Sequence, residues 1–320
     1  MFIKSLIKHI YNFYKFSVAS VLLKYGTFEI GDILITTKCP VACSFCIYNC
    51  NLKGENMPLK HIEELCKGYK KHKVKEIRLL GGEPFYTDKL LIDSFNIAKK
   101  YFPEKKIKIV TSGYFAVNQQ KTAEKLEPLI NIGLKEIQLS FDFFHLEKIP
   151  VKSFVNVLKF SKKAKLKVTL NIMYNDKLLL YLNDLKKLKQ QYQFDIRFGS
   201  IMNVGKAKLL GSEFKKTSKL FKFQEHLCKT KQNKLHHYLN RFSSSSCLHL
   251  MGFPNGNLYF CCIQLRNSLI GNLNNNTFDQ LYNNMKNSYI KNLFNSFKWL
   301  ISTKICYDTK CDVCPMQVKK

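Results

Sequence analysis

The sequence predicts an α/β protein: a partial (β/α)6 barrel of the TIM type with a small C-terminal cysteine-rich domain. Six apolar segments rich in β-branched residues alternate with segments of helical periodicity, at intervals of roughly 30 residues. Such intervals are too long for hairpins, so we expect parallel strands joined by helical crossovers. Six units are fewer than the eight of a closed barrel. The alternation stops near residue 203, and a second group of cysteines follows.

The individual elements follow from periodicity and from turn residues. Pro58 stands where a helix begins, and Gly81-Gly82 interrupts the second strand. Strands are expected near 33–37, 75–80, 107–111, 136–141, 167–173 and 194–201. Helices are expected near 59–71, 88–101, 119–130, 151–164, 177–191 and 277–286. Active sites of such folds lie at the carboxyl ends of the strands, so residues that directly follow a strand are the candidates for function.

The sequence divides into four parts: 1–29, 30–205, 206–246 and 247–320. The first part is apolar with interspersed lysines, and its longest uncharged run, 16–23, is too short to span a bilayer. It predicts a basic amphipathic helix that caps the fold or, alternatively, lies on a membrane surface. The second part is the barrel. A lysine-rich helical connector follows and ends at a serine run, 243–246, before the cysteine-rich domain.

The net charge of +29 comes almost wholly from lysine, because the chain has only four arginines. A protein that reads nucleic acid is expected to use arginine for two-pronged contacts with bases and phosphates, so nucleic acid is not an expected partner. The lysines either form a solvated background that reflects biased composition, or they attract an acidic peptide, RNA or an anionic membrane surface.

Three cysteines, Cys39, Cys43 and Cys46, follow the first strand in a C-x3-C-x2-C pattern. Thiolates are the ligands that iron–sulfur clusters prefer, and a loop lets several of them converge. Three ligands are one fewer than the usual four, so one iron would stay open to a small molecule. The alternative is three buried or disulfide-bonded cysteines. Clustered cysteines in a long chain favour metal binding in a reducing compartment, and therefore a cytoplasmic protein. We interpret Cys50 and the other single cysteines as structural.

Polar residues also follow the next strands. Gly81-Gly82-Glu83-Pro84 combines a flexible backbone with a carboxylate that can bind an ammonium group. Ser112 follows the third strand. Ser140 and Asp142 follow the fourth and are expected to point the same way by strand alternation. His145 lies beside them, and we interpret it as a structural histidine. The sequence assigns no catalytic side chain.

The cysteine pattern, with Phe45 before its last cysteine, resembles the signature of the radical S-adenosylmethionine (radical SAM) enzymes. The resemblance implies a 4Fe–4S cluster on the three cysteines, with S-adenosylmethionine on the open iron. It implies that Gly81-Gly82-Glu83-Pro84 and Ser112 hold the methionine end, that Ser140 and Asp142 reach the ribose, and that Phe45 packs near the adenine. The resemblance further implies that reductive cleavage of S-adenosylmethionine yields a 5′-deoxyadenosyl radical, which abstracts a hydrogen atom from the substrate. A reduced flavodoxin- or ferredoxin-like protein is the implied electron donor.

The C-terminal cysteines resemble the SPASM or twitch extension that carries auxiliary iron–sulfur clusters. An expected hairpin at Asn255-Gly256 leads to Cys261 and Cys262, of which we favour the first as a ligand. The resemblance implies one auxiliary cluster, because this chain has fewer cysteines here than the full pattern. Zinc would fit the same spacing. The ligand set implied is Cys247, Cys261, Cys306, Cys311 and Cys314.

Relatives with such an extension often modify ribosomally made peptides, so the resemblance implies a peptide or protein substrate, possibly acidic. The first alternative is a small-molecule enzyme similar to those that start molybdenum-cofactor synthesis. The absence of an arginine-rich tail for a nucleoside triphosphate counts against it. The second alternative is a non-enzymatic, basic zinc protein that associates with RNA.

Overall fold

The computed structural model describes residues 28–174, 181–200, 205–206, 249–260 and 269–287. Within these residues the chain forms one nine-stranded sheet in the order β6-β5-β4-β3-β2-β1-β7-β8-β9. The strands of the barrel portion are β1 (Ile30–Thr36), β2 (Glu76–Gly81), β3 (Ile107–Thr111), β4 (Glu136–Ser140), β5 (Lys167–Tyr174) and β6 (Asp195–Ser200). All six pair in parallel. The α/β partial-barrel prediction is confirmed.

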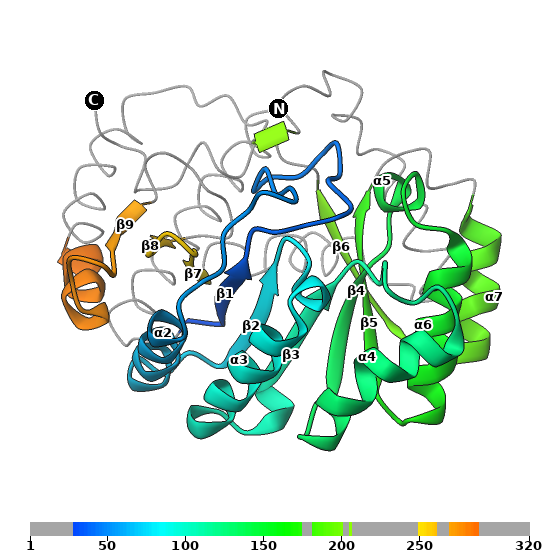
Figure 1. Ribbon diagram of the computed structural model, residues 1–320, viewed down its shortest axis with the longest axis horizontal. Helices are drawn as coiled ribbons and strands as arrows, with labels where there is room; N and C mark the ends of the chain where they lie inside the picture. The colour runs from blue at the N-terminus through cyan, green and yellow to red at the C-terminus, as the bar shows by residue number, and fades with distance from the viewer. Residues whose placement is uncertain (1–27, 175–180, 201–204, 207–248, 261–268, 288–320) are drawn as a thin grey trace, which may run out of the picture.

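Helices follow the strands and pack along the outside of the sheet (Figure 1). They are α2 (Leu59–Lys71), α3 (Asp88–Tyr101), α4 (Gln119–Asn131), α6 (Val151–Lys163) and α7 (Leu182–Tyr192). The short helix α5 (Phe143–Leu146) and the 3-10 turns η1 (Pro84–Tyr86) and η2 (Glu104–Lys106) were not predicted. Short turns carry too little periodicity to be detected. The expected helix near 177–191 is α7, and residues 175–180 lie outside the described residues.

Side chains of β1 alternate between two apolar clusters, which explains why this strand is buried throughout. Ile33 and Ile35 join the large core between the sheet and its helices. Leu34 points to the opposite face and packs with Leu80 and Met251 in a smaller cluster. The first strand is therefore an interior strand of the sheet, between β2 and β7, and the cysteine loop follows its carboxyl end.

The chain beyond the barrel portion extends the same sheet. β7 (His249–Gly252) pairs in parallel with β1, and β8 (Asn257–Phe260) and β9 (Leu269–Asn272) continue it antiparallel. The predicted hairpin at Asn255-Gly256 is confirmed, and Gly256 adopts the left-handed φ of 85° that such a turn favours. Residues 278–287 are helical, as predicted for 277–286. The described strands after residue 248 thus belong to the sheet of the barrel portion.

Tyr69 of α2 fixes this junction between the two parts. Its hydroxyl donates to the carbonyl oxygens of Asp32, at 3.0 Å, and Leu250, at 3.2 Å, on neighbouring strands. A Cβ atom at Gly31 would lie 2.3 Å from the Tyr69 ring, so only glycine lets the ring pack flat on β1. The fully buried ring therefore connects α2 with β1 and β7.

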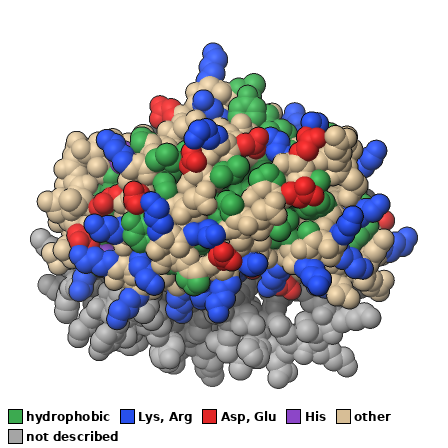
Figure 2. All heavy atoms as spheres, turned by 60° about the horizontal axis from the view of Figure 1, so that its bottom comes forward, with side chains coloured by type: hydrophobic (Ala, Val, Ile, Leu, Met, Phe, Trp, Pro, Cys, Tyr) green, Lys and Arg blue, Asp and Glu red, His purple; other side chains and the backbone are tan. Residues whose placement is uncertain are grey.

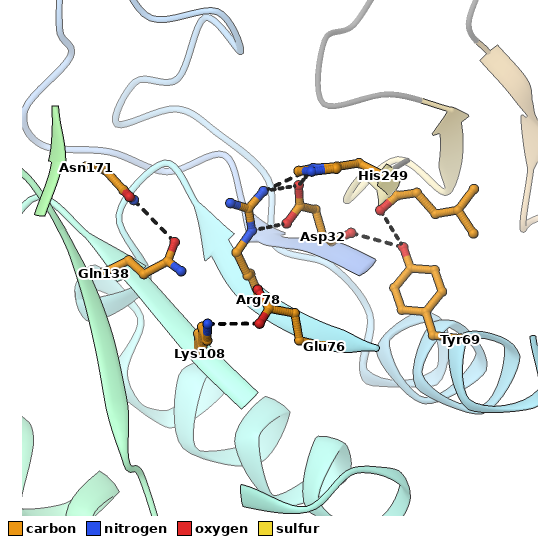
Figure 3. Close-up of polar contacts among 9 residues, drawn as sticks. Asp32, Tyr69, Glu76, Arg78, Lys108, Gln138, Asn171 and His249 are labelled. Carbon is orange, nitrogen blue, oxygen red and sulfur yellow. Dashed lines mark hydrogen bonds and ion pairs between the residues drawn. The ribbon is translucent and has the colours of Figure 1, made fainter. Parts of the chain in front are cut away.

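A layer of charged and polar side chains lies on the other face of these strands, opposite the helices (Figure 3). Arg78 donates from Nε and Nη2 to the two carboxylate oxygens of Asp32, both at 2.6 Å. His249 Nδ1 lies 3.3 Å from Asp32 Oδ2. Burial opposes ionisation of Asp32, but the charge of Arg78 and the hydrogen bonds from His249 and Arg78 lower its pKa to about 2. Lys108 pairs with Glu76 at 2.8 Å in the same layer.

We expect Asp32→Asn to lower the free energy of unfolding by about 3 kcal/mol at pH 7, because the largely buried Arg78 loses its counter-charge. The native contribution is present above the ordinary carboxyl pKa near 4 and is lost as the pH falls towards about 2. Denaturant melts between pH 7 and pH 2.5 would measure both effects. Replacing the exposed Lys89, paired with Asp93, by Ala is the control, with an expected cost of roughly 0.5 kcal/mol or less. Equal losses in the two variants would contradict this assignment.

No helix in the described ranges is long and apolar enough to cross a membrane. Residues 1–27 of the N-terminal segment and 207–246 of the connector lie outside the described residues, so the helices expected there stay predictions.

Candidate active site

The loop between β1 and α2 carries three of the predicted ligands and runs above the carboxyl ends of the strands (Figure 1). Backbone hydrogen bonds close it on itself: Thr37 N donates to Glu55 O at 2.8 Å and Cys39 N to Asn51 O at 2.9 Å. Cys39 and Cys43 are buried, and Cys46 is half-buried. None of the three is in a disulfide. Of the alternative of buried or disulfide-bonded cysteines, the structure contradicts the disulfides, whereas Cys39 and Cys43 are indeed buried.

The electrostatic environments of the three thiols differ. Burial raises the pKa of Cys39 to about 11. A hydrogen bond from the Cys50 side chain is the main cause that lowers the pKa of Cys46 to about 6. The Cys50 backbone N–H also donates to Cys46 Sγ at 3.4 Å. These hydrogen bonds favour the thiolate of Cys46, the form in which cysteine binds metal.

Cys50 is a component of this site that sequence analysis interpreted only as structural. It is buried, and its side chain touches that of Cys46. The available signal was its position, because it follows Cys46 at the same x3 spacing that separates Cys39 from Cys43. That spacing alone could not show on which side of the loop the thiol lies.

Glu83 is the second feature of the site. It is fully buried and follows β2. Its Oε1 accepts from Thr111 Oγ1 at 2.8 Å and from Phe85 N at 3.2 Å, and its Oε2 accepts from Ser112 N at 2.8 Å and from the Ser112 hydroxyl. Burial raises its pKa despite these donors. All four contacts come from neutral groups, and no cationic side chain among the described residues pairs with this carboxylate.

The glycines before Glu83 have a structural function within the chain itself. A Cβ atom at Gly82 would lie 2.2 Å from Lys38 O and 2.9 Å from Cys39 Cβ, and one at Gly81 would lie 2.3 Å from Thr36 O. Glu83 N donates to Lys38 O at 2.9 Å. The two glycines therefore let the end of β2 pack directly against the cysteine loop. Pro84 opens η1 and is buried.

The predicted residues beyond β4 lie in and around α5. Asp142 Oδ1 accepts from Phe144 N and His145 N, both at 3.1 Å, and its Oδ2 lies 2.9 Å from His145 Nδ1. Both carboxylate oxygens of this buried residue are thus occupied within α5. Ser140 ends β4 and is half-buried. Phe45 of the cysteine loop stacks on Phe144, with ring centroids 4.7 Å apart.

The structure therefore brings together residues from four strand ends. The thiols, Glu83 and the Thr111-Ser112 pair are linked through the end of β2 and the start of the loop, and α5 contacts the loop through Phe45. Thr111, the residue before Ser112, also belongs to the site, because its hydroxyl binds Glu83. The second group of predicted ligands, Cys247, Cys261, Cys306, Cys311 and Cys314, lies outside the described residues, as does Cys262. Their metal binding stays a prediction.

The described residues fit a three-cysteine iron–sulfur site better than a single-ion site. No three His, Cys, Asp or Glu side chains within the described ranges converge tightly enough for one metal ion. In a cluster each cysteine binds a different iron, so the sulfurs surround the inorganic core rather than converge on a point. The buried Glu83 carboxylate, with only neutral partners, suits the ammonium group of S-adenosylmethionine.

Residues 33–176 match the family model described as Radical SAM superfamily. Among curated proteins, the chain is 28% identical to GTP 3′,8-cyclase of Aquifex aeolicus (strain VF5) over 190 residues, 54% of this chain and 56% of the relative. It is 31% identical to GTP 3′,8-cyclase of Helicobacter pylori over 144 residues, 43% of this chain and 40% of the relative. The chain thus spans about half the length of the curated relatives it matches.

Two solved structures share the fold. Streptococcus suis SuiB bound to its precursor peptide SuiA aligns over 98% of this chain and 74% of SuiB, with a TM-score of 0.64 and 15% identity. The anSMEcpe enzyme with bound AdoMet and the Cp18Cys peptide aligns over 91% of this chain and 88% of its own, with a TM-score of 0.56 and 16% identity. At such identities the likeness concerns the fold. The match to the radical SAM family model over residues 33–176, together with this fold, identifies the protein as an enzyme.

Proposed function

We propose that this enzyme binds a 4Fe–4S cluster on Cys39, Cys43 and Cys46, binds S-adenosylmethionine beside it, and modifies a ribosomally made peptide or protein. When bound, the cluster and S-adenosylmethionine supply a 5′-deoxyadenosyl radical that abstracts a hydrogen atom from the substrate. The observation that carries the proposal is Glu83, a buried carboxylate with only neutral partners, hydrogen-bonded through Lys38 to the start of the cysteine loop.

The chain's own residues would orient the cofactor. Thr111, Ser112 and the Phe85 N–H fix the Glu83 carboxylate, so that it presents a negative charge in one direction at the strand ends. A charge-assisted hydrogen bond to an ammonium group is strongest where water is excluded. The Phe45–Phe144 stack supplies an apolar surface next to the loop, as the resemblance implies for the adenine.

A peptide substrate is supported by the extent of the fold likeness. The SuiB complex, whose partner is a precursor peptide, aligns in structure with 98% of this chain. The lysine-rich composition would favour an acidic peptide. On the face at the bottom of Figure 1, however, Lys and Arg lie interspersed with Asp and Glu (Figure 2). We therefore place the proposed peptide contact at the opposite face, around the strand ends.

The expected auxiliary cluster, electron donor and location belong to the same proposal. One auxiliary cluster on the C-terminal cysteines, a flavodoxin- or ferredoxin-like donor and a cytoplasmic location are all expected of a peptide-modifying enzyme of this kind. Contact of the N-terminal segment with a membrane surface is a separate hypothesis. The non-enzymatic zinc protein is set aside, because the protein is an enzyme.

A second candidate substrate is a nucleoside triphosphate, since both curated relatives are GTP 3′,8-cyclases. Triphosphates are commonly bound by arginine forks. Of the two arginines in the described part of the chain, Arg78 is already paired with the buried Asp32. This observation favours the peptide, while the sequence relatives favour the nucleotide.

The two candidates predict different results with the anaerobically reconstituted enzyme and a strong reductant. We expect release of 5′-deoxyadenosine to rise severalfold with acidic peptides from an unbiased library and to stay unchanged with GTP. Mass spectrometry of the stimulating peptide should show loss or transfer of hydrogen at a carbon atom. Deuterium transfer from labelled GTP into 5′-deoxyadenosine, without stimulation by any peptide, would replace the peptide proposal by the nucleotide one.

A further inference from the structure

His145 is the one histidine among the described residues that lies within interaction range of a proposed cluster ligand. Its ring is almost buried, with 12% of the side chain exposed. One ring nitrogen, Nδ1, lies 2.9 Å from Asp142 Oδ2. The Cys43 side chain also lies within interaction range of the ring. Its edge meets the face of Phe45, with ring centroids 5.3 Å apart and an interplanar angle of 81°.

These contacts fix the ring in one orientation. Asp142 is itself held by the N–H groups of Phe144 and His145, so the carboxylate cannot turn away without breaking the first turn of α5. Phe45 packs against the ring and belongs to the same loop as Cys43, two residues away in sequence. A carboxylate on one nitrogen of a histidine orients the ring and its other nitrogen. Here the Cys43 side chain is the other polar group within interaction range of the ring.

We propose that His145 is a positioning residue that donates a hydrogen bond to the sulfur of Cys43 when the cluster is bound, oriented by Asp142, and thereby makes the cluster easier to reduce. The inference rests on the proposed cluster at Cys39, Cys43 and Cys46. It replaces the interpretation of His145 as merely structural. It also assigns Asp142 a function different from the ribose contact that the family resemblance implies.

The expected direction of the change in reduction potential follows from the charge of the cluster. Reduction adds an electron to the cluster and increases the negative charge on its sulfur ligands. A hydrogen-bond donor at a ligand sulfur stabilises the reduced form more than the oxidised form, and so raises the reduction potential. Cys46 has its own donor in the Cys50 N–H at 3.4 Å. Backbone groups of Val41 and Ala42 hydrogen-bond to Cys39, so each of the three ligand sulfurs would have a donor from this chain.

Three variants separate the effect of the hydrogen-bond donor of His145 from the effect of its ring packing. His145→Phe keeps an aromatic ring against Phe45 and removes the donor, while His145→Gln keeps an amide donor. Asp142→Asn keeps a residue that can cap α5 but removes the charge that orients the ring. His61→Phe is the control, because His61 is also a buried histidine but lies on α2, and nothing places it at the cysteine loop.

The measurements are iron content and an anaerobic redox titration followed by electron paramagnetic resonance, without S-adenosylmethionine. To isolate the signal, the titration uses a background in which the C-terminal cysteines from 247 onward are replaced by Ala. We expect the ratio of reduced to oxidised cluster at a fixed poise to fall roughly 2- to 10-fold in His145→Phe. The fall should be smaller in His145→Gln and intermediate in Asp142→Asn. The spectrum of the reduced cluster should change in His145→Phe and remain unchanged in His61→Phe.

An unchanged potential in His145→Phe with full iron content would overturn the inference. If His145→Phe fails to hold a cluster, the comparison of His145→Gln with Asp142→Asn decides: unchanged potentials in both would also overturn it. Absence of a cluster in the parent protein would instead contradict the proposed function, so the two failures are distinguishable.

Discussion

Replacing Cys39, Cys43 and Cys46 together by Ala should remove one cluster's worth of iron and abolish cleavage of S-adenosylmethionine. The three thiols lie on one loop after β1, and the remaining predicted ligands begin about 200 residues later in the chain. Auxiliary iron on the C-terminal cysteines should therefore remain. Iron analysis, optical spectra and release of 5′-deoxyadenosine under reducing conditions would test this.

Cys66→Ala is the matched control for this triple variant. Cys66 is a buried thiol of α2 and has none of the contacts that link Cys46 to Cys50. It should keep its iron and its activity and lose only packing energy. A folded triple variant that loses all of its iron would show that the two cysteine groups are not independent. A triple variant that retains all of its iron would show that the loop is not a cluster site.

Glu83→Gln should weaken binding of S-adenosylmethionine on the order of 10- to 150-fold while iron content stays intact. The reason is the loss of a charge-assisted hydrogen bond of about 1.5–3 kcal/mol. The amide adds a second effect. Each carboxylate oxygen of Glu83 accepts a backbone N–H, from Phe85 or Ser112, so the NH2 group of the introduced amide would face one of these donors. We therefore expect a lower melting temperature as well.

Equilibrium binding of S-adenosylmethionine to the reconstituted enzyme, combined with thermal melts, separates the two effects. Glu124→Gln is the control, since Glu124 is exposed and pairs with Lys121 within α4. It should change neither affinity nor iron content. Unchanged affinity in Glu83→Gln, together with a lower melting temperature, would mean that Glu83 only stabilises the turn after β2.

The local sequence pattern was sufficient to predict a strand or helix where its apolar periodicity extended over the whole element. The barrel strands have 5 to 8 residues and the five main helices of the described chain have 11 to 14, enough to show their apolar periodicity. Their alternation predicts parallel pairing. Single short turns, such as α5, carry no such signal. Their position depends on contacts with distant segments, as in the stack of Phe144 on Phe45.

The sequence by itself determined the three-cysteine loop, the acidic residue after β2 and the α/β class, because each is encoded in spacing along a few neighbouring residues. Only the tertiary structure decided how these residues interact. It showed that Gly82 packs on the cysteine loop, that Thr111 and Ser112 both bind Glu83, and that Cys50 contacts Cys46. It also placed His145 beside Asp142 and near Cys43. Cys43 lies some hundred residues before His145 in the sequence. Such contacts depend on the register of neighbouring strands and on the paths of loops, which are set by burial of the whole core rather than by any local pattern.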